Sequence, residues 1–396
     1  MKKSLLALAA MGAFAGTAHA QSSVTVYGSL DAAISNADSG AATLNGTTTR
    51  LLGSRTVSDR LGFRGVEDLG GGKTAFFQLE TGIDPFVQNG GTAGSGDGTA
   101  KTSNTPGSWI TTRRPSFVGI SDKTLGKLQA GSQYSPGFLF TGYGDVAGNN
   151  TVGTNFSQAT VVSSVADAVA TTTTNTTTAF KMNAQSIRID SPSFAGLVVS
   201  GYAVTQSSAA NGAGKVHALA AAYTLGKFDT QAVWEVKTIA TNSGTTATPT
   251  KHVTMGIGGG YDFGVAKARL TYQKGELENQ ISGVKSGSNG LVTVTKLSAI
   301  APVTKQIDLF GAYILLNENA SGTLYGAANV QKSATAMSIG SAYHFSKRTN
   351  IYATYTTVEN NSNAGFAASG SATNIATGVV AGNDPKIMNI GMRHSF

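Results

Sequence analysis

The sequence predicts an all-β chain in which sixteen antiparallel strands close into a barrel that crosses a membrane. Most of the chain repeats segments of about ten residues that alternate apolar and polar side chains. Short turns between these segments alternate with long connections rich in Gly, Ser, Thr and Asn. An N-terminal leader indicates export, and no later apolar stretch approaches the ~20 residues of a membrane-spanning helix. Only helices and closed barrels satisfy every backbone group in lipid, so a barrel is expected.

The first residues have the features of a secretory signal peptide. Two lysines precede the apolar segment Leu5–Ala15, and the small residues of Ala18-His19-Ala20 fit a cleavage site. We therefore predict a signal peptide over residues 1–20 and a single barrel domain over residues 21–396. A membrane anchor is the alternative, and it is disfavoured because the apolar segment is too short to span a bilayer.

The composition favours a barrel and narrows the chemistry. The chain has 50 Gly, 8 Pro, only 13% charged residues and a mean hydropathy of -0.02, which does not suit a large two-layer core. Cysteine is absent, which excludes disulfides and thiolate chemistry. The net charge of +8 is spread along the chain, and no basic tract points to nucleic acid. The charge becomes important only where the cations converge on a pore.

Alternation assigns a face to each side chain. In Ser58–Asp68, Leu61 and Phe63 are predicted to point outward, and Arg60 and Arg64 inward. A soluble sandwich strand can show the same alternation, so this pattern alone leaves both folds open. The sixteen predicted strands cover residues 24–34, 58–68, 73–83, 112–122, 127–133, 182–191, 196–206, 216–225, 228–237, 253–263, 265–273, 292–301, 305–316, 335–345, 349–358 and 386–396.

Two further features bear on a membrane channel. Aromatic residues gather beside the short turns, as in the aromatic girdle at a membrane interface, although ordinary strand aromatics are the alternative. They are Tyr223, Phe228, Tyr261, Phe263, Tyr343 and Phe345. The longest connection runs from Tyr134 to about Lys181, and a connection of this length within a compact fold is expected to be functional or disordered.

Several segments resemble the Gram-negative general (non-specific) porin family. The chain ends in Met388–Phe396, whose terminal Phe resembles the C-terminal signature of bacterial outer-membrane barrels. The other segments follow the family in order along the chain and are strongest in strands and short turns. They are Val26–Asp31, Ser58–Gly70, Arg114–Ser121, Gly126–Tyr134 and Ser186–Pro192.

This resemblance implies a homotrimer of sixteen-stranded barrels in the outer membrane, each a water-filled channel for passive diffusion of ions and small hydrophilic solutes. It implies contact with outer-membrane lipid and lipopolysaccharide, and recognition of the last strand, ending at Phe396, by the barrel-insertion machinery. It also implies that the third loop, here the connection after Tyr134, folds into the lumen and narrows it. No cofactor, metal or catalytic residue is implied.

The resemblance also points to residues of the constriction. The family places a ladder of basic side chains opposite the third loop, and the matching positions are Arg60, Arg64, Arg114 and Arg188. The loop offers only two acids, Asp145 and Asp167, and lacks the acidic stretch of enteric members. Because rings of basic side chains favour anions, we expect a mild anion preference, with Lys267, Arg269 and Arg393 adding potential nearby. The alternative is that the arginines pair with lumen carboxylates such as Glu80 or Asp31 and are structural.

Other functions are less well supported. A solute-specific channel would use the same barrel with an aromatic track, and the loop aromatics Phe138, Phe140, Tyr143 and Phe156 leave this open, unless they anchor the loop to the wall. An exported β-sandwich adhesin conflicts with the terminal Phe. A hydrolase is disfavoured because no G-x-S-x-G elbow occurs and the histidines lack metal-like spacing.

Overall fold

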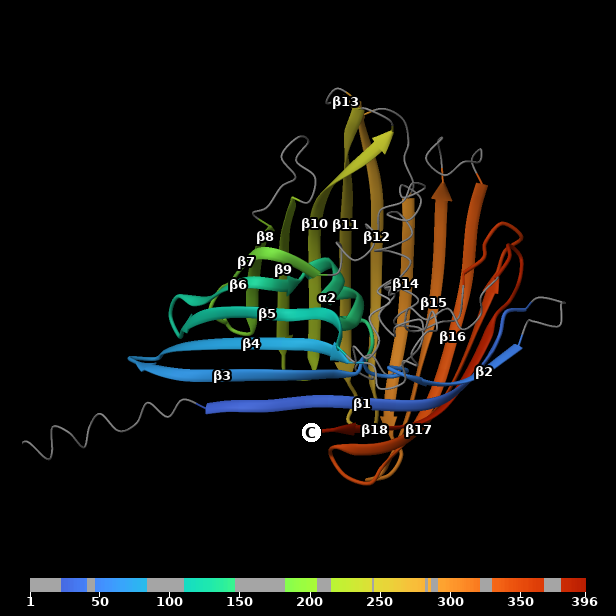
Figure 1. The fold of residues 1–396 in the computed structure, drawn as a ribbon, viewed down its shortest axis with the longest axis horizontal. Coiled ribbons are helices and arrows are strands. Elements are labelled where there is room, and N and C mark those ends of the chain that lie inside the picture. The colour runs from blue at the N-terminus through green and yellow to red at the C-terminus, as the bar shows by residue number, and fades with distance from the viewer. Residues whose placement is uncertain are drawn as a thin grey trace, which may run out of the picture.

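The computed structural model describes residues 23–40, 47–83, 110–146, 182–204, 215–243, 246–281, 284–285, 291–320, 330–366 and 379–396. Nearly all of them belong to one antiparallel sheet (Figure 1). The elements are β1 Ser23–Asp38, β2 Thr47–Gly53, β3 Arg60–Gly70, β4 Lys73–Ile83, β5 Ile110–Asp122, β6 Gly126–Tyr134, α2 Pro136–Tyr143, β7 Met182–Asp190, β8 Leu197–Val204, β9 Val216–Leu225, β10 Phe228–Ser243, β11 Thr246–Asp262, β12 Lys267–Ile281, β13 Val284–Lys285, β14 Leu291–Pro302, β15 Ile307–Ala320, β16 Val330–His344, β17 Thr349–Asn360 and β18 Lys386–Ser395. In the part of the chain described, no helix has the length and apolarity needed to cross a membrane.

The sheet closes on itself. β1 pairs with β18 on one side and with β2 and β3 on the other, and each remaining strand pairs with its neighbours in chain order. The sheet counts 18 strands, but β2 and β3 share one position along β1, and β13 is a two-residue extension beside β12. Sixteen strand positions therefore close the barrel formed by the described residues, which confirms the predicted fold class.

The side-chain faces distinguish this barrel from a soluble sandwich. Large apolar side chains lie exposed on the outer surface, among them Phe63, Ile257 and Leu270. Polar side chains between them point inward and are buried, among them Glu235 and Gln273. A sandwich would bury the apolar row instead. The outward prediction for Phe63 and the inward predictions for Arg60 and Arg64 agree with this arrangement, because Arg64 lies against the inward ring of Tyr27.

Several strand boundaries differ from the prediction, and two of the differences have a clear physical reason. The second strand was predicted to start at Ser58, whereas β3 starts at Arg60 and a separate strand, β2, precedes it. The sequence of β2 begins with three threonines and has no apolar alternation, so it was missed. β10 and β11 also run beyond their predicted ends, to Ser243 and back to Thr246. Outside the bilayer a hairpin can continue without an apolar face, and alternation no longer marks its end.

The C-terminus seals the barrel at β1. Phe396 exchanges two backbone hydrogen bonds with Gly28, each 3.1 Å long. The Phe396 ring lies where a Cβ on Gly28 would be, and that Cβ would also come within 2.6 Å of the Arg60 carbonyl oxygen. Glycine at position 28 therefore allows the terminal ring to pack over the seam. The predicted C-terminal signature is thus a closing contact in the structure.

The outer wall carries an aromatic belt and an apolar hollow. The predicted girdle residues flank the short turns, where Tyr261 packs edge-on against Phe263 at 4.9 Å between ring centroids.

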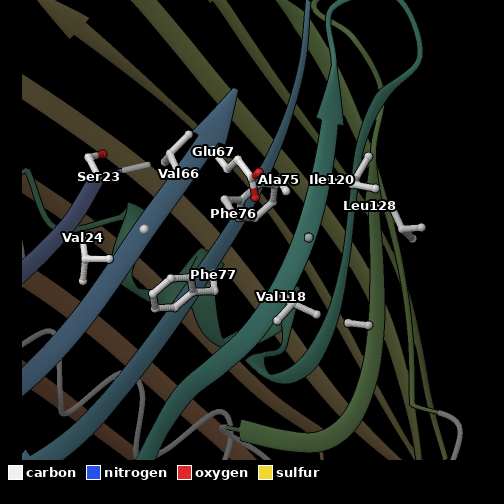
Figure 2. Close-up of a pocket in the computed structure, with 13 residues that line it drawn as sticks. Ser23, Val24, Val66, Glu67, Ala75, Phe76, Phe77, Val118, Ile120 and Leu128 are labelled. Carbon is white, nitrogen blue, oxygen red and sulfur yellow. The ribbon is translucent and has the colours of Figure 1, made fainter. Parts of the chain in front are cut away.

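The apolar hollow on the outer wall, about 620 Å³ in volume, spans β1 and β3 to β6 (Figure 2). Gly65 is among its lining residues. Phe77 and Val118 also line it (Figure 2).

Candidate functional site

A short helix directly follows β6, which is the fifth strand position of the barrel. Ser135 begins it by accepting a hydrogen bond from the Phe138 amide at 3.3 Å, and Pro136 suits the first helical turn because it has no amide hydrogen to leave unpaired. The helix, α2, contacts β9, β10 and β11, and lies beside them in Figure 1. Since its partners on these strands are inward-facing side chains, the first part of the third loop lies inside the barrel.

The N-terminus of α2 is held by a buried carboxylate of β10. Glu235 accepts hydrogen bonds from the Gly137 amide at 2.8 Å and from the Ser135 hydroxyl at 3.2 Å. Lys237 pairs with the same carboxylate at 2.8 Å. Free amides and the helix dipole make a helix N-terminus favourable for an anion. Glu235 is fully buried, so its charge is stabilised by these partners and not by water.

The C-terminus of α2 is held by donors from the next strands. Lys296 Nζ donates to the Thr141 carbonyl at 2.9 Å, and Arg269 Nη1 donates to the Tyr143 carbonyl at 3.0 Å. Ser298 Oγ donates to the Gly144 carbonyl at 2.6 Å. Cations are favourable at a helix C-terminus, where the last carbonyls lack partners within the helix. The charges of the wall therefore complement both ends of the helix.

Two of the three aromatic residues of α2 fix the helix against the wall. Phe140 and Tyr143 are buried in a small cluster with Val233 of the wall. The Tyr143 hydroxyl donates to Asp229 at 2.5 Å, and the Arg269 guanidinium lies 4.3 Å from the Tyr143 ring centroid. Burial and the hydrogen bond to Asp229 raise the pKa of Tyr143, so the phenol stays protonated. These contacts agree with the alternative that the loop aromatics anchor the loop, whereas Phe156 lies outside the described residues.

Two of the four predicted arginines form ion pairs on the inner wall. Arg114 pairs with Glu80, and both side chains are largely buried. Glu80 also accepts a hydrogen bond from the Tyr27 hydroxyl at 2.9 Å. Arg188 pairs with Asp190 at 2.7 Å. Each of these pairs has a net charge near zero. For Arg114 and Arg188 this agrees with the alternative hypothesis that the arginines pair with lumen carboxylates and are structural.

The other two arginines, both on β3, carry uncompensated charge. Arg60 is half-buried and Arg64 is exposed, and among the described residues neither has an acidic partner. The Arg64 guanidinium lies 5.3 Å from the Tyr27 ring centroid, which orients it along the wall. In the strand order, β3 lies across the barrel from the strands that contact α2. The helix and the two arginines therefore border the lumen from opposite sides.

Of the two predicted acids of the loop, the one that the structure describes, Asp145, is turned toward the wall behind the helix. Asp145 is 2% exposed, and its charge interacts favourably with Lys296 of the wall behind the helix. Asp167 lies outside the described residues. Lys267 and Arg269, expected to add positive potential to the pore, share Asp229 at 3.0 Å each. Their charge is therefore offset in part.

Sequence reasoning missed the residues that hold the helix. Glu235 and Lys296 both fall in predicted strands, at positions whose alternation points inward. That signal would have placed them on the lumen face. It does not indicate that they meet the loop, because Glu235 and Ser135 are separated by 100 residues in the chain.

Comparison with known proteins agrees with this fold. Residues 7–363 match the model of a Gram-negative porin family. The chain belongs to that family. This porin is 26% identical to an outer membrane porin protein of Bordetella pertussis over 438 residues, and 29% identical to outer membrane porin protein 32 of Delftia acidovorans over 409 residues. Both alignments cover 100% of this chain and of the relative.

Solved structures share the barrel of this porin. An anion-selective porin from Comamonas acidovorans has a TM-score of 0.73 at 21% identity, with 95% of this chain and 100% of that chain covered. OmpT of Vibrio cholerae in its trimer form has a TM-score of 0.64 at 14% identity, covering 95% and 99%. At such identities the likeness shows the fold alone. Family and fold together make the porin an outer-membrane channel for passive diffusion, as the sequence predicted.

Proposed function

We propose that this porin admits small hydrophilic solutes and ions through a constriction between α2 and the wall that carries Arg60 and Arg64, with a mild preference for anions. The observation that carries this proposal is the unpaired state of these two arginines among the described residues, on the side of the lumen facing the helix. Ions lose part of their hydration at a constriction, so wall charges act more strongly there than in bulk water.

The charge balance of the inner wall supports this preference. The Arg114–Glu80 and Arg188–Asp190 pairs add little net charge, whereas Arg60 and Arg64 leave a positive excess. The acid that the described part of the loop contributes, Asp145, is buried behind the helix. A related fold is that of a porin described as anion-selective. We expect a preference for anions here because the positive charges of Arg60 and Arg64 are not offset by an acidic partner among the described residues.

A general channel fits the loop better than a solute-specific one. A specific channel often has aromatic side chains along the solute path. Here Phe140 and Tyr143 are buried against the wall, and Phe138 is half-buried and packs on Tyr134. We also propose a channel without enzymatic activity, which is in keeping with the porin family and the barrel fold. We also propose that residues 1–20 are the export signal and that the insertion machinery recognises the final strand.

We propose that three copies assemble. A protein of similar fold, OmpT of Vibrio cholerae, is described in a trimer form. The apolar hollow on the outer wall of β1 and β3 to β6 offers a place where a neighbouring copy can insert side chains (Figure 2). The remaining outer surface is apolar and suits membrane lipid, and lipopolysaccharide would surround the end with the long loops.

The test is the conductance of the purified porin in planar bilayers, with the zero-current potential measured under a KCl gradient. We expect large conductance steps grouped in threes and a potential that favours chloride. A small conductance blocked by one solute would replace the general channel with a specific one. A potential that favours potassium would contradict the role assigned to Arg60 and Arg64.

A further inference from the structure

The link between β2 and β3, residues 54–59, interrupts the second strand position of the barrel. β1 pairs with both strands, Ala32 with Gly53 and Ser29 with Arg60. From Gly53 to Arg60 the chain takes seven residue steps, while β1 takes three over the same stretch of wall. The surplus residues cannot stay in the plane of the sheet, so the link bulges to one side of it.

The bulge lies on the inner side. Asp31 of β1 faces the lumen and is 0% exposed. One of its carboxylate oxygens accepts hydrogen bonds from the Thr56 amide at 2.6 Å, the Thr56 hydroxyl at 2.7 Å and the Val57 amide at 3.0 Å. Its other oxygen accepts a hydrogen bond from the inward Tyr352 hydroxyl. A carboxylate that points into the barrel can bind the link in this way only if the link covers it from the lumen.

The link has a fixed shape. The Asp59 carboxylate accepts a hydrogen bond from the Asp31 amide at 2.6 Å, and the Asp59 amide donates to the Ser54 hydroxyl at 2.8 Å. Ser54 turns the chain with φ of 57°, a conformation that side chains rarely adopt and that the surrounding bonds maintain. Arg55, Thr56 and Asp59 are buried, and Val57 and Ser58 are half-buried. A segment bonded at so many points is rigid compared with an ordinary loop.

We propose that residues 54–59 form a second narrowing element of the pore, on the wall that faces α2, and that Asp31 is the positioning residue that holds it. This inference rests on the proposed diffusion channel. A solute that passes α2 then meets the link on the opposite side. Arg60 follows the link directly, so the same anchor sets the position of one of the two uncompensated arginines.

Two kinds of variant test this inference. Deletion of Thr56–Asp59 leaves three residue steps between Gly53 and Arg60, the number that β1 takes, and produces a continuous strand. We expect its single-channel conductance to rise by roughly one half, because conductance follows the open area of the pore, and its size limit for polyethylene glycols to increase. The chloride preference should persist, since Arg60 and Arg64 remain.

The second kind of variant replaces Asp31, as Asp31→Ala and Asp31→Asn. If the deletion variant does not fold, these two variants test whether residues 54–59 narrow the pore. Alanine removes every acceptor and should raise conductance and current noise, whereas asparagine keeps a carbonyl oxygen and should stay near wild type. Asp308→Asn is the control, because Asp308 is a lumen-facing carboxylate that bonds His344 at 2.9 Å, away from the link. Folding is checked by circular dichroism and by heat-dependent mobility on gels.

The outcomes separate the two proposals. If the wild-type protein forms no channel, the proposed function itself fails. If it conducts, but a folded deletion variant or folded Asp31→Ala shows wild-type conductance and size limit, only the second narrowing element is overturned. An equal rise in conductance in Asp308→Asn would also overturn it, because the effect would then belong to any lumen carboxylate.

Discussion

The two walls that border the lumen use charged residues in different ways. Under α2, Glu235 and Lys296 are buried, and each bonds to one end of the helix. On the opposite wall, Arg60 and Arg64 keep their charge in the lumen without an acidic partner among the described residues. Both sets occupy inward positions in alternating strands. The difference shows that alternation determines the face of a side chain, while its contacts determine whether it positions the loop or acts on ions.

The two walls also differ in what stabilises their charged side chains. A buried charge loses its hydration, and that loss is large unless hydrogen bonds and an opposite charge replace it. Glu235 finds both in the helix N-terminus and Lys237. Arg64 stays exposed to the lumen and stacks beside Tyr27, so its hydration is largely retained. The wall under α2 should therefore respond to mutation through stability, and the arginine wall through selectivity.

The largest effect is expected from reversing charge on the arginine wall. In Arg60→Glu/Arg64→Glu the positive excess facing α2 becomes negative, so the zero-current potential under a KCl gradient should change sign toward potassium. The matched control is Lys347→Glu/Arg348→Glu, which alters charge equally on an exposed turn. An equal shift in the control would show that the overall field of the protein, and not the constriction, sets the preference.

The next effect is expected at the N-terminus of α2. Glu235→Ala removes the acceptor for two donors of the helix and the ion-pair partner of Lys237. Breaking a buried pair from one side should lower the free energy of unfolding by ~3 kcal/mol, measured by urea titration of the protein in lipid. In Glu276→Ala the lost pair with Lys274 is solvent-exposed, so that control should change by less than ~1 kcal/mol. Similar losses in both variants would contradict a special role for Glu235.

A smaller effect is expected at the C-terminus of the helix. Lys296→Met keeps the apolar stem but removes the hydrogen bond to the Thr141 carbonyl. The free energy of unfolding should fall by about 1–2 kcal/mol, as for one charge-assisted hydrogen bond. Open-channel current noise should rise, because that end of the helix is held less firmly. Unchanged noise together with lower stability would mean that Lys296 supports the barrel and not the position of the helix.

The sequence allowed the barrel to be predicted because alternation repeats in strand after strand, and the inward faces of Arg60 and Arg64 followed from the same rule. Features that break the rule were not predicted. β2 and the link at residues 54–59 lack alternation, and the link is shaped by Asp31, which lies more than twenty residues earlier in the chain. The partners of α2 are side chains on distant strands. Contacts of this kind depend on how the closed barrel brings strands together.

The smallest effect is expected when an ion pair is removed as a whole. Taking away Arg188 alone leaves the charge of Asp190 in the lumen, and should weaken anion preference; Asp190→Asn alone should strengthen it. Arg188→Gln/Asp190→Asn removes both charges, so its zero-current potential should stay close to wild type. Neutralising Arg60 and Arg64 to glutamine also removes two charges, but both are positive, and the potential should move clearly toward potassium. An equal shift in the two double variants would contradict this expectation. It would mean that an acidic partner does not decide whether an arginine affects ion selectivity, so Arg188 would not differ from Arg60 and Arg64.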